Sequence, residues 1–116
     1  MPHALHSPRP AAQAKALRGA GIAIALASGV GTPLRSIAEQ LIRAAASVPA
    51  NVTEGQGRAG KDRFYHWRVA YGSAREVEVH QGLLLEAGAV DFERAAEALG
   101  LFDEVRAMLW RMMHPR

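Results

Sequence analysis

Residues 34–60 read LRSIAEQLIRAAASVPANVTEGQGRAG and contain the most distinctive pattern of the chain. Apolar side chains recur there at steps of three and four residues, at Leu34, Ile37, Leu41, Ala44 with Ala45, Val48 and Val52. This spacing predicts one helix with a single apolar stripe. Pro49 cannot donate a backbone hydrogen bond, so we expect a kink there and a helix that resumes beyond it. Gly55, Gly57 and Gly60 then predict the connection to the next helix.

The flanking sequence predicts three more helices. Residues 11–28 form the first, with an apolar face at Leu17, Ala20, Ile24 and Ala27. Residues 61–88 form the third, with one face made of Phe64, Trp67, Ala70, Tyr71, Ala74, Val77, Gln81 and Leu84. The fourth follows Asp91, its expected N-cap, and presents Phe92, Ala95, Ala96, Leu99, Phe102, Val105, Leu109 and Met112. No stretch alternates with period two and the connections are short, which predicts an all-α, antiparallel up-and-down four-helix bundle.

Two local signals refine this expectation. Thr32 followed by Pro33 predicts the start of the second helix, with Thr32 as N-cap and Pro33 in the first helical position. Ala70, Gly72 and Ala74 are small, and we expect neighbouring helices to approach most closely there. A leucine at position 72 would then overfill the contact.

The composition bounds the class of protein. A chain of 116 residues with 49% hydrophobic and 22% charged residues can form one compact core but has no room for a second domain. Cysteine is absent, which excludes a disulfide scaffold and a thiolate metal site and fits a cytoplasmic location.

The N-terminal region allows two interpretations. We expect residues 1–10 to be a flexible tail and residues 11–116 to form the bundle as one domain. The uncharged run Gly19–Leu34 is too short and too weakly apolar for a membrane span. The alternative is a signal peptide that ends near Ala27, which would leave only three helices in the mature protein.

Charge is divided unevenly along the chain. Residues 1–75 carry ten Lys and Arg against three Asp and Glu, a net +7, whereas residues 76–116 carry four against eight, a net −4. The total is +3. Such a division favours an anionic partner, or contact between oppositely charged halves of different copies.

No motif for catalysis or metal binding is present. Residues 55–60 match G-x-G-x-x-G, but a predicted helix precedes them where a dinucleotide site needs a strand, so an inter-helix turn is expected. His66 and His80 are fourteen residues apart on one helix, about 20 Å, and cannot share an ion. Ser73 lacks the G-x-S-x-G context. We therefore expect no enzyme activity, no metal and no cofactor.

The segment 47–58 resembles the four helix bundle protein family, first described from intervening sequences in bacterial large-subunit ribosomal RNA genes. The matching residues are Ser47, Pro49, Asn51, Glu54, Gly55, Gly57 and Arg58, with Arg43-Ala44-Ala45 before them and Phe64, Ala70, Gly72-Ser73, Glu76 and Glu78 after them. The likeness covers about residues 37–113. The first helix departs from the pattern, because it is rich in Ala and Gly where the family is usually charged and aromatic.

The resemblance implies binding without catalysis. It assigns structural or binding roles, and no catalytic ones, to Arg43, Pro49, Asn51, Glu54, Gly55, Gly57, Gly72, Ser73 and Glu76. A similar bundle, the accessory variability determinant protein of diversity-generating retroelements, is a pentameric barrel that associates with a reverse transcriptase and nucleic acid. The likeness therefore implies a ring-like homo-oligomer, a pentamer, with RNA or DNA and a reverse transcriptase as possible partners.

Asn51 and Glu54 also have a physical reason to be polar. They follow Pro49, where the helix has lost a backbone hydrogen bond and polar side chains can satisfy the freed groups. A buried Glu54 would need a cationic partner, and Arg43, Arg58 or an arginine of another subunit would serve.

The leading functional hypothesis is a non-enzymatic nucleic-acid or ribonucleoprotein accessory protein. Its expected contacts are Arg58, Lys61, Arg63, Arg68 and Arg75. Lys61, Arg68 and Arg75 are seven residues apart and form a basic stripe on one helix face. The alternative is a protein–protein scaffold without nucleic acid, in which the basic third helix of one copy meets the acidic fourth helix of the next.

Overall fold

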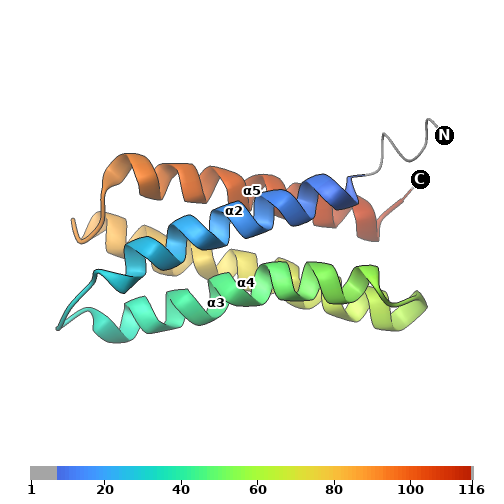
Figure 1. The fold of residues 1–116 in the computed structure, drawn as a ribbon, viewed down its shortest axis with the longest axis horizontal. Helices are drawn as coiled ribbons and strands as arrows, with labels where there is room; N and C mark the ends of the chain where they lie inside the picture. Colours follow the sequence, from blue (N-terminus) through green and yellow to red (C-terminus); the bar gives the residue numbers. More distant parts are fainter. Residues whose placement is uncertain (1–7, 116) are drawn as a thin grey trace.

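The computed structural model describes residues 8–115, and the chain forms four helices there. These are α2 (Arg9–Ser28), α3 (Arg35–Gln56), α4 (Gly60–Glu86) and α5 (Phe92–Met113). They run alternately up and down, so that α2 begins at the same end as α5 finishes (Figure 1). α2 and α4 each pack against both α3 and α5, which closes the bundle. The predicted antiparallel up-and-down four-helix bundle is confirmed.

The core extends along the whole bundle, which measures 49 × 25 × 19 Å. Its largest fully buried side chains include Leu41 on α3, Trp67 and Leu84 on α4, and Phe102 and Leu109 on α5. The predicted stripe of α3 is buried from Leu41 to Val52. The predicted face of α4 is likewise buried at Trp67, Ala70, Ala74, Val77, Gln81 and Leu84. Helical spacing therefore identified the inward faces of these two helices.

The inward face of α2 differs from the prediction. Leu17 is 57% exposed, and the buried stripe consists mainly of the alanines Ala12, Ala16, Ala20, Ala23 and Ala27. Apolar residues lie on every side of this helix, so their spacing alone does not single out one face. The small stripe brings α2 close to α5, and a Cβ at Gly19 would stand 3.2 Å from the Phe102 ring.

At the start of α5 the prediction is confirmed for Asp91 and wrong for Phe92. The Asp91 carboxylate accepts a hydrogen bond from the backbone N–H of Arg94 at 2.9 Å, which confirms the predicted N-cap. Phe92 is 68% exposed, although the preceding Ala89 and Val90 pack against the core.

The turn before α3 also differs from the prediction. Thr32 and Pro33 precede the helix, which begins at Arg35 after the N-cap Leu34. The backbone N–H of Leu34 donates to the carbonyl of Gly31 at 3.1 Å. Residues 31–34 thus close a turn of their own, and the helix starts two residues later than predicted.

The connection from α3 to α4 is the inter-helix turn that the glycines predict. α3 ends at Gln56 with Gly57 as C-cap, and α4 begins at Gly60. Gly60 has φ +59, a left-handed conformation that glycine adopts without steric cost.

Pro49 lies inside α3, which runs from Arg35 to Gln56. Its side chain is buried. The expected kink at this residue stays a prediction.

The predicted close approach at Gly72 is wrong. Gly72 is exposed, and a Cβ built there meets no atom within 4 Å. It lies on the outer face of α4, whereas its small neighbours Ala70 and Ala74 are buried.

α2 covers the first helix that the sequence predicts, but it starts at a different residue. α2 begins at Arg9, two residues earlier than predicted, because prolines are tolerated in the first helical turn. The remainder of the expected flexible tail, residues 1–7, lies outside the described residues. No helix within residues 8–115 is both long and apolar enough to cross a membrane.

Candidate nucleic-acid interface

Arg58, the first of the five predicted contact residues, forms hydrogen bonds with acids on both sides of the α3–α4 turn. Its Nε and Nη2 donate to Glu54 Oε2 at 3.0 and 2.9 Å, and its Nη1 donates to Asp62 Oδ2 at 3.2 Å. The hydrogen bonds and charges of Glu54 and then Asp62 raise the pKa of Arg58. Glu54 is half-exposed rather than buried. Of the cationic partners that the sequence analysis considered for it, Arg58 is the one that pairs with it.

Arg63 also has a structural role. Its Nε donates to the carbonyl of Gly55 at 3.0 Å, and its guanidinium lies over the Trp67 ring at 5.5 Å. A cation against the last carbonyls of a helix complements the helix dipole. Arg63 therefore caps the C-terminus of α3 from its position on α4. It is only partly exposed, whereas the other four predicted contact residues are exposed.

Lys61, Arg68 and Arg75 remain exposed along α4. Within residues 8–115, none of the three takes part in an ion pair. Their seven-residue spacing keeps them on one face of the helix over about 20 Å. We call these three side chains the basic stripe.

Two acids of the acidic C-terminal segment pair with cations of α2 inside the bundle. Lys15 pairs with Glu104 at 2.9 Å and Arg18 pairs with Glu97 at 2.7 Å, which ties α2 to α5. These contacts match cations of the basic half with acids of the acidic half within a single copy. Opposite charges of the two halves thus form ion pairs between α2 and α5. The three cations of the basic stripe form no ion pair within the described residues.

Arg106 makes the corresponding link between α5 and α4. Its Nε donates to Glu78 Oε2 at 2.8 Å, its Nη2 donates to Asp103 Oδ1 at 3.0 Å, and its guanidinium lies 5.8 Å from the Tyr71 ring centre. Partial burial lowers the pKa of Arg106, but Glu78 and Tyr71 outweigh it and the pKa is raised overall.

A groove of about 410 Å³ opens beside the basic stripe, between α4 and the last turns of α5. It is lined by Arg68, Tyr71, Gly72, Arg75, Trp110, Met113 and His114. The missing side chain at Gly72 leaves this part of α4 open, with no atom within 4 Å of a built Cβ. Two arginines without an acid partner and an exposed indole therefore border one cavity, which we call the α4–α5 groove.

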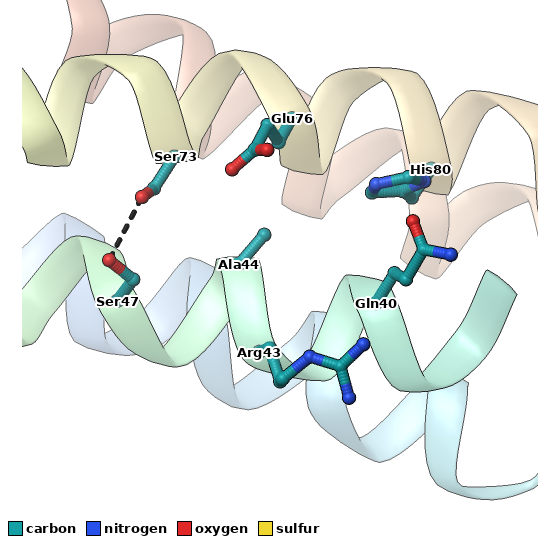
Figure 2. Close-up of a pocket in the computed structure, with 7 residues that line it drawn as sticks. All are labelled: Gln40, Arg43, Ala44, Ser47, Ser73, Glu76 and His80. Atoms are coloured by element: carbon teal, nitrogen blue, oxygen red, sulfur yellow. Dashed lines mark hydrogen bonds between the residues drawn. The ribbon is translucent and has the colours of Figure 1, made fainter. Parts of the chain in front are cut away.

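A second groove, of about 340 Å³, lies between α3 and α4 and holds several motif residues (Figure 2). Ser73 Oγ donates to Ser47 Oγ at 2.9 Å, and Asn51 Nδ2 donates to the same hydroxyl at 3.1 Å. Asn51 Oδ1 lies 3.0 Å from His66 Nδ1. These contacts join α3 to α4, which gives Asn51 and Ser73 a structural role.

Arg43 and Glu76 border the same second groove from opposite helices (Figure 2). Neither takes part in an ion pair within the described part of the chain. Arg43 therefore offers an exposed, uncompensated guanidinium away from the basic stripe.

The other motif residues are distributed through the bundle. Pro49 and Gly55 are buried in α3, and Gly57 caps its C-terminus. Gly72 lies in the α4–α5 groove. The motif thus combines helix packing, a turn and one position next to the basic stripe.

The sequence did not predict the aromatic side of the α4–α5 groove. Trp110 follows Leu109, a core residue, and is half-exposed, while His114 comes one turn later on the same face. One feature of the sequence could have indicated it: Trp110 stands next to the core position Leu109, and a second ring, His114, follows four residues later on the same helix face.

Comparison with known proteins supports the fold and gives the family. No curated protein matches the chain. A crystal structure from Bacteroides thetaiotaomicron, described as a protein of unknown function from the S23 ribosomal protein family, aligns with a TM-score of 0.81 at 18% sequence identity. The alignment covers 91% of this chain and 97% of that one.

The sequence match is concentrated in the last three helices. The family model described as 23S rRNA-intervening sequence protein matches residues 31–111. This range spans most of the chain and begins after α2, the helix that departs from the expected pattern. The chain belongs to the 23S rRNA-intervening sequence protein family.

Proposed function

We propose that this protein is a non-enzymatic accessory protein that binds nucleic acid through the basic stripe. One observation supports this above the others: Lys61, Arg68 and Arg75 are exposed on one face of α4 and have no acid partner within residues 8–115. Uncompensated cations in a row attract a phosphate backbone, and binding releases the counterions condensed on it.

The contact set is smaller than the one expected from sequence. Arg58 and Arg63 contribute to the α3–α4 turn, so replacing them would disturb the fold as well as any ligand. We therefore assign phosphate contact to the three residues of the basic stripe. Such contacts do not depend on base identity, so we expect little sequence preference.

The scaffold alternative has less support. It requires the acids of α5 to meet the basic face of another copy, but Glu97 and Glu104 are paired with α2 of the same copy. Assembly itself is compatible with the proposal. A pentameric ring, as the likeness to the accessory variability determinant protein implies, would repeat the basic stripe around its surface, with a reverse transcriptase as the proposed protein partner.

A matched pair of single substitutions tests the proposal. Arg68→Gln removes one cation from the basic stripe, whereas Arg43→Gln removes an exposed cation from the α3–α4 side that also takes part in no ion pair within the described residues. Binding to labelled mixed-sequence RNA is followed by fluorescence anisotropy at low salt. We expect Arg68→Gln to weaken binding clearly and Arg43→Gln to have little effect. Equal losses in the two variants, or no binding by the unmodified protein, would contradict the proposal.

A further inference from the structure

We propose that the α4–α5 groove selects single strands, with Trp110 as the surface on which an unpaired base stacks. The inference rests on the proposed function and adds a substrate class to it. Trp110 belongs to α5 and is distinct from the three cations that contact phosphate.

The Trp110 ring is held in place yet accessible. It is 52% exposed and stacks on the His114 imidazole, with ring centres 4.0 Å apart and planes 20° from parallel. His114 Nδ1 lies 2.8 Å from the Trp110 carbonyl, which fixes the imidazole relative to the helix. An aromatic surface that is ordered before binding costs less entropy when a base joins the stack.

The opposite side of the groove supplies the charge. Arg68 and Arg75 line it from α4, and Gly72 between them leaves space next to the helix. Tyr71 and Met113 contribute apolar surface to the same cavity. Aromatic rings bordered by cations that follow a phosphate backbone are the combination used to bind single-stranded nucleic acid.

This combination discriminates against a duplex. Double-stranded nucleic acid presents phosphates to the basic stripe, but the faces of its bases are hidden in the helical stack. A single strand offers both phosphates and free base faces, so it alone gains the contact with Trp110.

The test measures the affinity of the full chain for two labelled probes. One is single-stranded oligothymidylate, and the other is the duplex of oligothymidylate and oligoadenylate. We expect the unmodified protein to prefer the single strand. Trp110→Ala should weaken single-strand binding by about 5-fold or more and leave duplex binding unchanged. Trp110→Phe, which keeps an aromatic face, should retain most of the preference. Circular dichroism checks that each variant is folded.

Tryptophan fluorescence gives an independent readout. Trp67 is buried and Trp110 is half-exposed, so quenching on addition of oligothymidylate should occur and should disappear in Trp110→Ala. If Trp110→Ala loses no single-strand affinity while Arg68→Gln does, base stacking is refuted and phosphate binding stands. If the unmodified protein binds neither probe, both proposals are refuted.

Discussion

The indole of Trp67 on α4 occupies the space where a side chain of residue 55 on α3 would lie. A Cβ built on Gly55 would overlap with Cδ1 and Nε1 of Trp67 and stand 3.1 Å from the carbonyl of Arg63. In that position Trp67 Nε1 donates to the carbonyl of Val52 at 3.2 Å. The close contact of α3 with α4 therefore depends on glycine at position 55.

Gly55→Ala is expected to destabilise the bundle. The added methyl group must displace a buried ring or the backbone of α4, and overpacking of this kind costs about 1–3 kcal/mol. Denaturation in urea, followed by circular dichroism, measures the change. An unaltered midpoint would show that Trp67 can move without penalty, contrary to the packing described.

Gly72→Ala is expected to have the opposite effect. Position 72 is exposed and a Cβ there meets nothing within 4 Å, so the methyl group fits while the unfolded chain loses freedom. Such replacements in a helix stabilise by about 0.5–1 kcal/mol. The same urea experiment applies, and a loss of stability would contradict the placement of Gly72 on the outer face.

Gln81→Met is expected to stabilise the protein. Gln81 is fully buried, and neither its Nε2 nor its Oε1 has a hydrogen-bond partner among residues 8–115. Methionine keeps a similar shape and removes polar atoms whose burial costs about 1–3 kcal/mol each when unpaired. Thermal unfolding gives the direction of the change, and a lower transition temperature would argue that the amide is satisfied.

Arg106→Gln is expected to destabilise by about 1–2 kcal/mol, because hydrogen bonds between charged groups are lost across α4 and α5. Arg18→Gln is the control, since Arg18 is much more exposed in its pair with Glu97 and such pairs contribute less than about 1 kcal/mol. Chemical denaturation of both variants makes the comparison. Equal effects would mean that the partial burial of Arg106 does not matter.

The sequence predicted those parts of the fold where one helix face differs clearly from the other. α3 and α4 have such faces, and the buried set from Leu41 to Leu84 follows the predicted spacing. α2 does not, because alanines fill its inward side while Leu17 points outward. The helical period alone does not show whether the small alanines of α2 or its larger Leu17 pack against the core.

The candidate site was predicted less completely, because it depends on contacts between distant residues. Seven-residue spacing identified Lys61, Arg68 and Arg75 as one stripe. The spacing could not reveal that Arg58 binds Glu54 and Asp62, or that Trp110, on a helix far along the chain, borders the same groove as Arg68.

The salt dependence of nucleic-acid binding tests the central claim most directly. The observed binding constant for single-stranded RNA is measured over a range of salt concentrations for the unmodified protein and for a variant with glutamine at Lys61, Arg68 and Arg75. Each phosphate contact contributes about −0.7 to the slope of log K against log salt for a single strand, so the variant's slope should be shallower by about 2. Helical circular dichroism should be the same in both proteins. Identical slopes, or no binding by the unmodified protein at low salt, would contradict a basic stripe that contacts phosphate.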